Sequence, residues 1–372
     1  MATRFRIFTK RFLILCNIGV VLFFLLACLA PYLSPQKWWF ISFLGIGFPF
    51  LVIAAIAFMI GWLFVKRKLA LLSAIALLIG IKSISVFFAF NIAKKFTAKK
   101  ESGSIRIATW NVARFIEMKR NNNKGSQIRL KMMDLIKEQE ADIFCMQEFF
   151  HSNDSAWYPN LEYIRHHFNY PYYYYAHDND GDKHFIGSVI FSRYPIIDSG
   201  MIRYPRPTLP ESLMHVDVKV NDDTIRVYTT HLQSLQFQKS DYEKIDKIKE
   251  GEGGVVSNSK TIFSKLRTGI SYRKIQTDIV KQVLDDSPYP FLFCADLNDV
   301  PNSYTYFTIK SGLQDAFLKT GFGIGRTFSA LSPTLRIDYI FAQDQFTIKQ
   351  FKRIVRPYSD HYMLVSDIEL KK

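Results

Sequence analysis

Acidic residues are missing from the first part of this 372-residue chain. Residues 1–100 contain no aspartate or glutamate and carry 13 lysines and arginines, whereas residues 101–372 hold all 33 acidic residues and 35 basic ones. The formal net charge of +15 is therefore concentrated at the N-terminal end, and the remainder carries only +2. The basic excess flanks apolar runs, so the charge of the whole chain does not indicate a nucleic-acid partner.

Cysteine is scarce and has no functional spacing. Cys16 and Cys28 lie in an apolar run, and Cys145 and Cys294 lie in strand-like stretches. No cluster of cysteine and histidine has the spacing of a zinc site, and small buried thiols are the simpler interpretation. The four cysteines predict neither a disulfide nor a metal site, and they do not define the redox compartment.

Long apolar runs fill the acid-free part, at residues 12–33, 38–65 and 69–93. Each exceeds the ~20 residues that cross a bilayer as a helix. We therefore predict an integral membrane domain of three transmembrane helices over residues 1–93, followed by a basic linker over residues 94–103. The first run could also be an uncleaved signal sequence, but it is longer than a signal core and no clear small-x-small cleavage site follows it.

Basic residues flank the apolar runs unevenly and predict the orientation. Four precede the first run, within residues 4–11, and three separate the second run from the third, at residues 66–68. The positive-inside rule places these segments in the cytoplasm. Three crossings then place the C-terminal domain on the outer, periplasmic side of a bacterial-type inner membrane. Four lysines within residues 94–100 oppose this orientation.

Short strands and helices alternate from residue 102 onward. Strands are predicted at 105–112, 141–148, 172–178, 186–192, 291–298, 336–342 and 363–370, and a hairpin is predicted about the turn at 221–223. Helical spacing covers 126–139, and a mostly polar helical segment with a glycine-rich break at 251–254 covers 233–285. Because no linker interrupts this alternation, residues 104–372 are predicted to form one α/β domain with two packed sheets.

Polar residues of a few types end these apolar strands. They are Asn111, Glu148, His231, Asp296, Asn298, Asp338, Asp360 and His361. A buried carboxylate costs several kcal/mol unless it is paired or binds a cation, so we expect the strand ends to converge on one site. Oxygen ligands suit Mg²⁺. Imidazoles and carboxylates suit metal-assisted attack of water on a phosphate. Turn or capping chemistry remains the alternative for the two asparagines, and a purely structural role remains the alternative for Asp338.

Seven short motifs stand in a familiar order: TWNV (109–112), MQE (146–148), GSVIFSRYPI (187–196), TTHLQS (229–234), ADLNDVPNS (295–303), RIDYIF (336–341) and SDHY (359–362). The sequence resembles the endonuclease/exonuclease/phosphatase superfamily, which includes deoxyribonucleases, abasic-site endonucleases, neutral sphingomyelinases and inositol polyphosphate phosphatases. The resemblance covers about residues 104–372. It implies a four-layer sandwich of two mixed β-sheets flanked by helices.

The resemblance also implies a divalent metal site. Glu148 would be the principal ligand, Asn111 would bind metal or phosphate, and Asp360 would complete the metal environment. Mg²⁺ is the expected ion, with Mn²⁺ as an alternative. Some relatives carry an aspartate two residues after the asparagine, where this chain has Ala113, and this departure puts a two-metal site in doubt.

The remaining motif residues would carry the reaction. By the resemblance, His231 contacts the scissile phosphate, and Asp296 orients or activates the attacking water. Asn298 binds a phosphate oxygen. Asp338 holds His361, which stabilises the transition state.

The favoured function is that of a membrane-anchored, metal-dependent phosphoesterase acting on a phosphodiester or phosphomonoester of a lipid or lipid-linked substrate. The apolar runs would hold the site beside a bilayer, and teicoplanin-resistance-type membrane proteins and bacterial sphingomyelinases share this layout. A membrane-tethered Mg²⁺-dependent nuclease is the alternative, and it would need a basic groove. Soluble phosphate esters and a binding module with an inactive site are further options. The sequence indicates no obligate protein partner.

Overall fold

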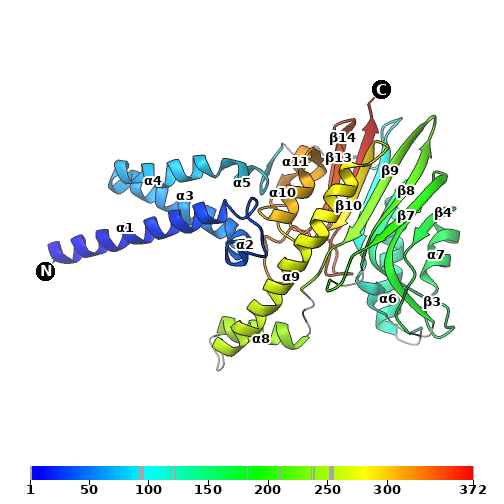
Figure 1. Cartoon of the computed structure of the whole chain (residues 1–372), viewed down its shortest axis with the longest axis horizontal. Helices are drawn as coiled ribbons and strands as arrows, with labels where there is room; N and C mark the ends of the chain where they lie inside the picture. Colours follow the sequence, from blue (N-terminus) through cyan, green and yellow to red (C-terminus); the bar gives the residue numbers. More distant parts are fainter. Residues whose placement is uncertain are drawn as a thin grey trace.

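The computed structural model describes the chain except for residues 1, 92–95, 118, 121–122, 182, 209–210, 236, 238, 251–254 and 372. Lys94 and Lys95 of the predicted basic linker and the predicted break at 251–254 lie outside the described residues. A group of N-terminal helices projects from one side of an α/β body that runs from β2 to β15 (Figure 1).

The N-terminal helices are α1 (Ala2–Ala27), α2 (Trp39–Ile46), α3 (Phe48–Val65), α4 (Arg67–Ile79) and α5 (Ile81–Ser85). Two of them, α1 and α3, are long and apolar enough to cross a membrane by length and composition, and only 22% of each candidate span is buried. They leave large apolar side chains uncovered, such as Phe8 and Phe64. Exposed apolar surface of this extent marks an interaction site, and it weakly indicates association with a membrane.

The prediction of a third span over residues 69–93 is wrong. Helix α4 has 13 residues, or about 20 Å of helix, which is shorter than the ~30 Å core of a bilayer. It ends at Gly80, where a Cβ atom would lie 2.3 Å from the ring of Phe24 in α1. After the five-residue α5, the chain turns to β1 (Ala89–Phe90), which pairs with β12 (Phe322–Gly323). The end of the apolar run therefore packs on the α/β body.

The α/β body contains two large mixed sheets. The first has the order β14-β15-β2-β3-β6-β4, with β5 paired to β6. Its strands are β2 (Ile105–Asn111), β3 (Ile143–Ser152), β4 (Tyr172–Tyr175), β5 (Asp178–Asn179), β6 (His184–Ser192), β14 (Phe346–Ile354) and β15 (Met363–Leu370). The second has the order β11-β13-β10-β9-β8-β7. Its strands are β7 (Ile196–Arg203), β8 (Ser212–Val220), β9 (Asp223–His231), β10 (Phe291–Asp296), β11 (Leu313–Asp315) and β13 (Asp338–Gln343).

Alternating side chains divide the core into layers. In β10, Leu292 and Cys294 enter the apolar cluster between the sheets, whereas Phe291 and Phe293 enter the cluster on the outer face. Helices α9 (Val255–Asp285) and α10 (Tyr304–Lys310) cover that outer face. Helices α6 (Asn123–Glu138) and α7 (Asn160–His167) cover the outer face of the first sheet. The predicted α/β arrangement of mixed sheets and flanking helices is therefore confirmed, as are the predicted strands and the hairpin.

Three short elements complete the body. They are the 3₁₀ helix η1 (Ala113–Glu117), α8 (Lys239–Glu250) and α11 (Ala316–Thr320). Strand β14 was not predicted, because its FTIKQFKRI sequence places charged residues along an edge strand. Such charges keep an edge strand from pairing with other chains.

Buried hydrogen bonds join the N-terminal helices to the body. The Asn302 side chain donates to the carbonyl of Ala27 at 2.9 Å, and the Arg336 guanidinium donates to the carbonyl of Val86 at 2.7 Å. Arg336 also pairs with Asp315 at 2.6 Å, and both side chains are 1% exposed. The helix α2 approaches so closely that a Cβ atom at Gly45 would lie 2.6 Å from the carbonyl oxygen of Asn302. Unpaired partners would be costly at such buried positions, so this joint fixes the helices on the body.

The close approach of Gly45 gives a stability test. We expect Gly45→Ala to lower the stability of the full chain by about 1–3 kcal/mol, because the added methyl group overlaps a backbone atom. Thermal unfolding in detergent measures the change. Gly19→Ala in α1 is the matched control, since no atom lies within 4 Å of its Cβ position and alanine favours a helix by about 1 kcal/mol over glycine. Equal melting temperatures for the two variants would contradict this packing.

Candidate active site

The register of the second sheet aligns three of the predicted site residues. His231 ends β9 and lies beside Asp296, the last residue of the parallel strand β10. Asp296 in turn lies opposite Asp338, the first residue of the antiparallel strand β13. The three side chains therefore form one row across the end of the sheet, as expected when strand ends converge.

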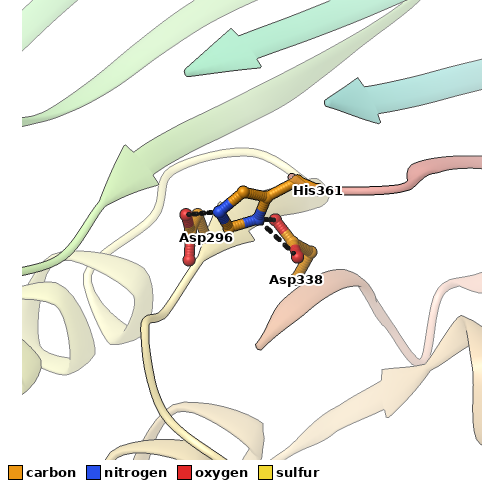
Figure 2. Close-up of side chains that lie close together, drawn as sticks. All are labelled: Asp296, Asp338 and His361. Carbon is orange, nitrogen blue, oxygen red and sulfur yellow. Dashed lines mark hydrogen bonds and ion pairs between the residues drawn. The ribbon is translucent and has the colours of Figure 1, made fainter. Parts of the chain in front are cut away.

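His361 reaches this row from the loop before β15. Its Nδ1 atom lies 3.0 Å from both carboxylate oxygens of Asp338, and its Nε2 atom lies 3.7 Å from Asp296 (Figure 2). The indole of Trp110 donates a hydrogen bond to the carbonyl of His361 at 2.9 Å. Ser359 fixes the same loop by donating to the carbonyl of Asn111 at 2.8 Å. The first sheet therefore holds the backbone of His361, and the second sheet orients its ring.

Asp296 is the centre of the cluster and has no solvent exposure. Its Oδ1 atom accepts a hydrogen bond from the backbone of Asn298 at 2.9 Å, and its Oδ2 atom accepts one from the Asn111 side chain at 3.0 Å. The Nε2 atoms of His231 and His361 lie 3.5 Å and 3.7 Å from the same carboxylate. Among the described residues, its ion-pair partners are these two imidazoles and no lysine or arginine.

Glu148 enters the site through an irregularity in β3. The pairing of β3 with β6 shifts between Met146 and Phe149, and Glu148 has a φ of +48°. A bulge of this kind redirects a side chain, and left-handed backbone at a non-glycine residue is strained. The Glu148 carboxylate consequently leaves the plane of the sheet and accepts a hydrogen bond from Asn111 at 3.1 Å.

Both histidines of the cluster favour the charged form. Burial alone would lower the pKa of His361, but the charges of Asp338 and Asp296 outweigh it and hold that pKa well above its ordinary value. Burial acts in the same sense on His231. The charge of the adjacent Glu211, with those of Asp296 and Glu148, outweighs this effect of burial and raises the pKa of His231 to about 10. Both rings are therefore biased toward the imidazolium form, while burial also raises the pKa of the partner Glu211 and that of Asp338, the latter to about 6.

Glu211 is a site residue that the sequence analysis missed. Its Oε2 atom lies 2.8 Å from Nδ1 of His231, so it orients that ring as Asp338 orients the ring of His361. The pairing in the predicted hairpin could have revealed Glu211. In the observed register Leu213 lies opposite Thr230, and counting back two residues, past the start of β8, reaches Glu211 beside the end of β9.

A cavity of about 570 Å³ opens in front of the cluster. Five of the eight predicted site residues line it: Glu148, His231, Asn298, Asp360 and His361. The other three stand behind this wall and hold it in place: Asn111, Asp296 and Asp338. The structure thus brings all eight residues to one site, and their individual roles stay predictions.

The front of the site carries oxygen donors of the kind that suit a divalent cation. The carboxylates of Glu148 and Asp360 border the same cavity, and no described lysine or arginine pairs with either. Asp296, Asp338 and His361 also offer ligand atoms within 4.8 Å of one another. A histidine that shares its proton with Asp338 is a poor ligand, however, and metal ligation needs a neutral ring. The side-chain nitrogen of Asn111 donates to the carboxylates of Glu148 and Asp296, and its side-chain oxygen accepts from the backbone of Ala113 at 3.0 Å.

Comparison with known families agrees with the site. The model of the Endonuclease/Exonuclease/phosphatase family matches residues 108–361, so the chain belongs to this family. The predicted resemblance is therefore confirmed, and the fold and family define a phosphoesterase-type hydrolase. A second family, described as a domain of unknown function, matches residues 10–87. No curated protein matches the sequence.

Solved structures share the fold of the body. An endonuclease/exonuclease/phosphatase from Beutenbergia cavernae is 18% identical with a TM-score of 0.50, and the match covers 72% of each chain. A humanized TDP2 from D. rerio is 16% identical with a TM-score of 0.50, and the match covers 72% of this chain and all of that one. At these identities the likeness shows the fold alone.

Replacement of Glu211 tests the pairing with His231. We expect Glu211→Gln to lower kcat about 10- to 100-fold, because a hydrogen bond to a charged group contributes about 1.5–3 kcal/mol. Removal of the carboxylate also lowers the pKa of His231, so the alkaline limb of the pH–rate profile should move to lower pH. Glu162→Gln is the matched control, since Glu162 lies 3.5 Å from His151 in a second glutamate–histidine pair. A profile unchanged by Glu211→Gln would contradict the assignment.

Proposed function

We propose that the chain is a membrane-associated, metal-dependent phosphoesterase that hydrolyses a phosphate ester of a lipid or lipid-linked substrate. The observation that carries the proposal is the pairing of the imidazoles of His231 and His361 with the buried carboxylate of Asp296 at the wall of a cavity. Two fixed positive charges beside a carboxylate suit a reaction in which negative charge develops on phosphate oxygens while water attacks.

His231 and His361 bind the phosphate in this mechanism. Their Nε2 atoms stand 3.5 Å and 3.7 Å from Asp296, beyond a good hydrogen bond. Each can therefore donate to a phosphate oxygen in the cavity. Asn298 borders the same cavity. Its backbone has a φ of +50°, and its backbone N–H donates a hydrogen bond to Asp296. These donors position the ester and stabilise the charge of the transition state.

In this mechanism Asp296 takes the proton of the attacking water, which must reach this carboxylate between the imidazoles of His231 and His361, behind the cavity wall. The oxygen of that water forms a bond to phosphorus as the bond from phosphorus to the leaving oxygen breaks, and the leaving oxygen receives a proton from an imidazolium or from solvent. A divalent cation held by Glu148, with Asp360 and Asn111, would neutralise charge on the phosphate. Mg²⁺ is the proposed ion because these ligand atoms are oxygens.

The N-terminal helices support the choice of a lipid substrate. Two of them expose apolar surface of membrane-spanning length, and buried hydrogen bonds hold them on the body beside the ADLNDVPNS motif. The body itself carries almost no net charge, whereas a nuclease needs cations along its groove. A membrane-tethered nuclease is therefore the second choice.

The basic residues support a position of the body on the outer side of the membrane. The start of α1 and the turn between α3 and α4 lie together at the end of the N-terminal helices that is remote from the sheets (Figure 1). These are the segments with the basic residues at 4–11 and 66–68. The positive-inside rule assigns that end to the cytoplasm. The body lies at the other end of these helices and then faces the opposite side, and the chain returns there through α4, which packs on α3, and α5, although neither is long enough to span a membrane alone.

Hydrolysis by the purified full chain tests this function. In detergent with Mg²⁺, we expect turnover of a polyprenyl phosphate or sphingomyelin, and little turnover of plasmid DNA, short RNA or an inositol phosphate. EDTA should abolish activity, and Mg²⁺ or Mn²⁺ should restore it. Glu148→Gln should lower kcat about 100-fold, the order expected when one preorganised electrostatic group is lost.

The exposed Glu140 supplies the control for that variant. Glu140→Gln should retain wild-type turnover. Activity that survives EDTA would show that the reaction needs no metal. Cleavage of DNA without cleavage of any lipid would show that the substrate is a nucleic acid.

A further inference from the structure

The cavity in front of the catalytic cluster has a second, apolar end. Besides Glu148, His231 and His361, hydrocarbon side chains of the helices α2, α8 and α9 line it. We call this part the apolar groove and define it by six residues: Phe43, Ile46, Ile245, Ile262, Phe263 and Leu266. A single continuous cavity thus joins the reacting groups to an apolar surface.

The N-terminal helices form one wall of this groove. Phe43 and Ile46 belong to α2, and the ring of Phe43 meets the ring of Phe263 in α9 edge to face at 5.1 Å. Arg267 of α9 lies over the ring of Trp39 in α2 at 5.3 Å. Helix α2 follows α1 and precedes α3, the two candidate membrane spans. The groove therefore ends beside the part of the chain with the most exposed apolar surface.

The rest of the groove wall comes from the polar segment that follows the TTHLQS motif. Its helices α8 and α9 extend from the sheets on the same side as the N-terminal helices (Figure 1). Ile245 of α8 and Ile262 and Leu266 of α9 turn apolar side chains to the cavity. Apolar side chains at an open cavity remain in contact with water and add little to the stability of a helical insert. Their presence here indicates an apolar ligand.

A cationic group marks the boundary between the two ends. Arg273 of α9 is 2% exposed, borders the cavity and donates to the carbonyl of Gln233 at 2.9 Å. Its Nε atom lies 3.5 Å from Asp299, next to Asn298 of the catalytic wall. A charge at this position suits a polar head group, and the volume of about 570 Å³ lies within the usual range for one small-molecule ligand.

We propose that the apolar groove binds the single hydrocarbon chain of an amphiphilic phosphate ester while the ester group lies against His231 and His361. This inference rests on the proposed function and adds a chain-binding site formed jointly by α2, α8 and α9. The order of groups along the cavity, charged and then apolar, is the order of groups along such a ligand. Burial of methylene groups contributes about 0.8 kcal/mol each, so the groove selects for chain length.

Paired substrates that differ only in chain length test the proposal. The probes are butyl and dodecyl phosphate and the 4-nitrophenyl phosphodiesters of butanol and dodecanol, used below micellar concentrations with the full chain in lipid nanodiscs. We expect kcat/KM for the dodecyl ester to exceed that for the butyl ester at least 10-fold. Leu266→Gln should abolish this preference by lowering kcat/KM for the dodecyl ester. Phe43→Ala, on α2, should weaken the preference in the same way.

Leu130→Gln is the matched control, since Leu130 is an exposed leucine on α6, on the far layer of the sandwich. Equilibrium binding of dodecyl phosphate gives a second readout that needs no turnover, and Leu266→Gln should weaken it at least 10-fold relative to Leu130→Gln. If Leu266→Gln leaves both the chain-length preference and the binding of dodecyl phosphate unchanged, the proposed chain-binding groove is wrong. If Leu266→Gln weakens a chain-dependent binding but no ester is hydrolysed, the groove is supported and the proposed function is wrong.

Discussion

The buried carboxylate of Asp296 is the constraint on which the site depends. A charge without solvent is tolerated only when neighbouring groups compensate it, and here two imidazoles, one amide side chain and one backbone amide surround it. These groups come from both sheets. The requirement to satisfy one carboxylate therefore fixes the distance and rotation between the two halves of the sandwich, and the position of the catalytic wall follows.

Much of the site was predictable because the end of an apolar strand is marked locally in the sequence. The apolar strands before Asn111, His231 and Asp296 are short and clearly bounded, so their polar ends had to lie at one edge once the sheets were packed. The alternation of strands and helices had already predicted two packed sheets, and the family resemblance added the helices that flank them. Glu211 escaped because it precedes a strand and belongs to no motif, although the register of the hairpin placed it beside His231.

The other features could not be predicted, because they depend on contacts between residues that are distant in the sequence. The third apolar run reads as a span, but Gly80 packs against a ring of α1 and the strand β1 pairs with residues more than 200 positions away. Hydropathy does not record such pairing. The apolar groove was equally invisible. Its residues come from α2, α8 and α9, where each sequence has only an ordinary amphipathic or apolar pattern.

The joint between Asn302 and Ala27 has a kinetic consequence. An enzyme attached to a membrane by a loose tether explores a hemisphere of solution, and most of its collisions are with molecules in water. Here the catalytic loop rests directly on the end of α1, so the cavity keeps one height and one tilt with respect to the helices. With α1 and α3 embedded in a lipid leaflet, its search would be two-dimensional, and encounter rates would follow the density of the ester per unit area of membrane.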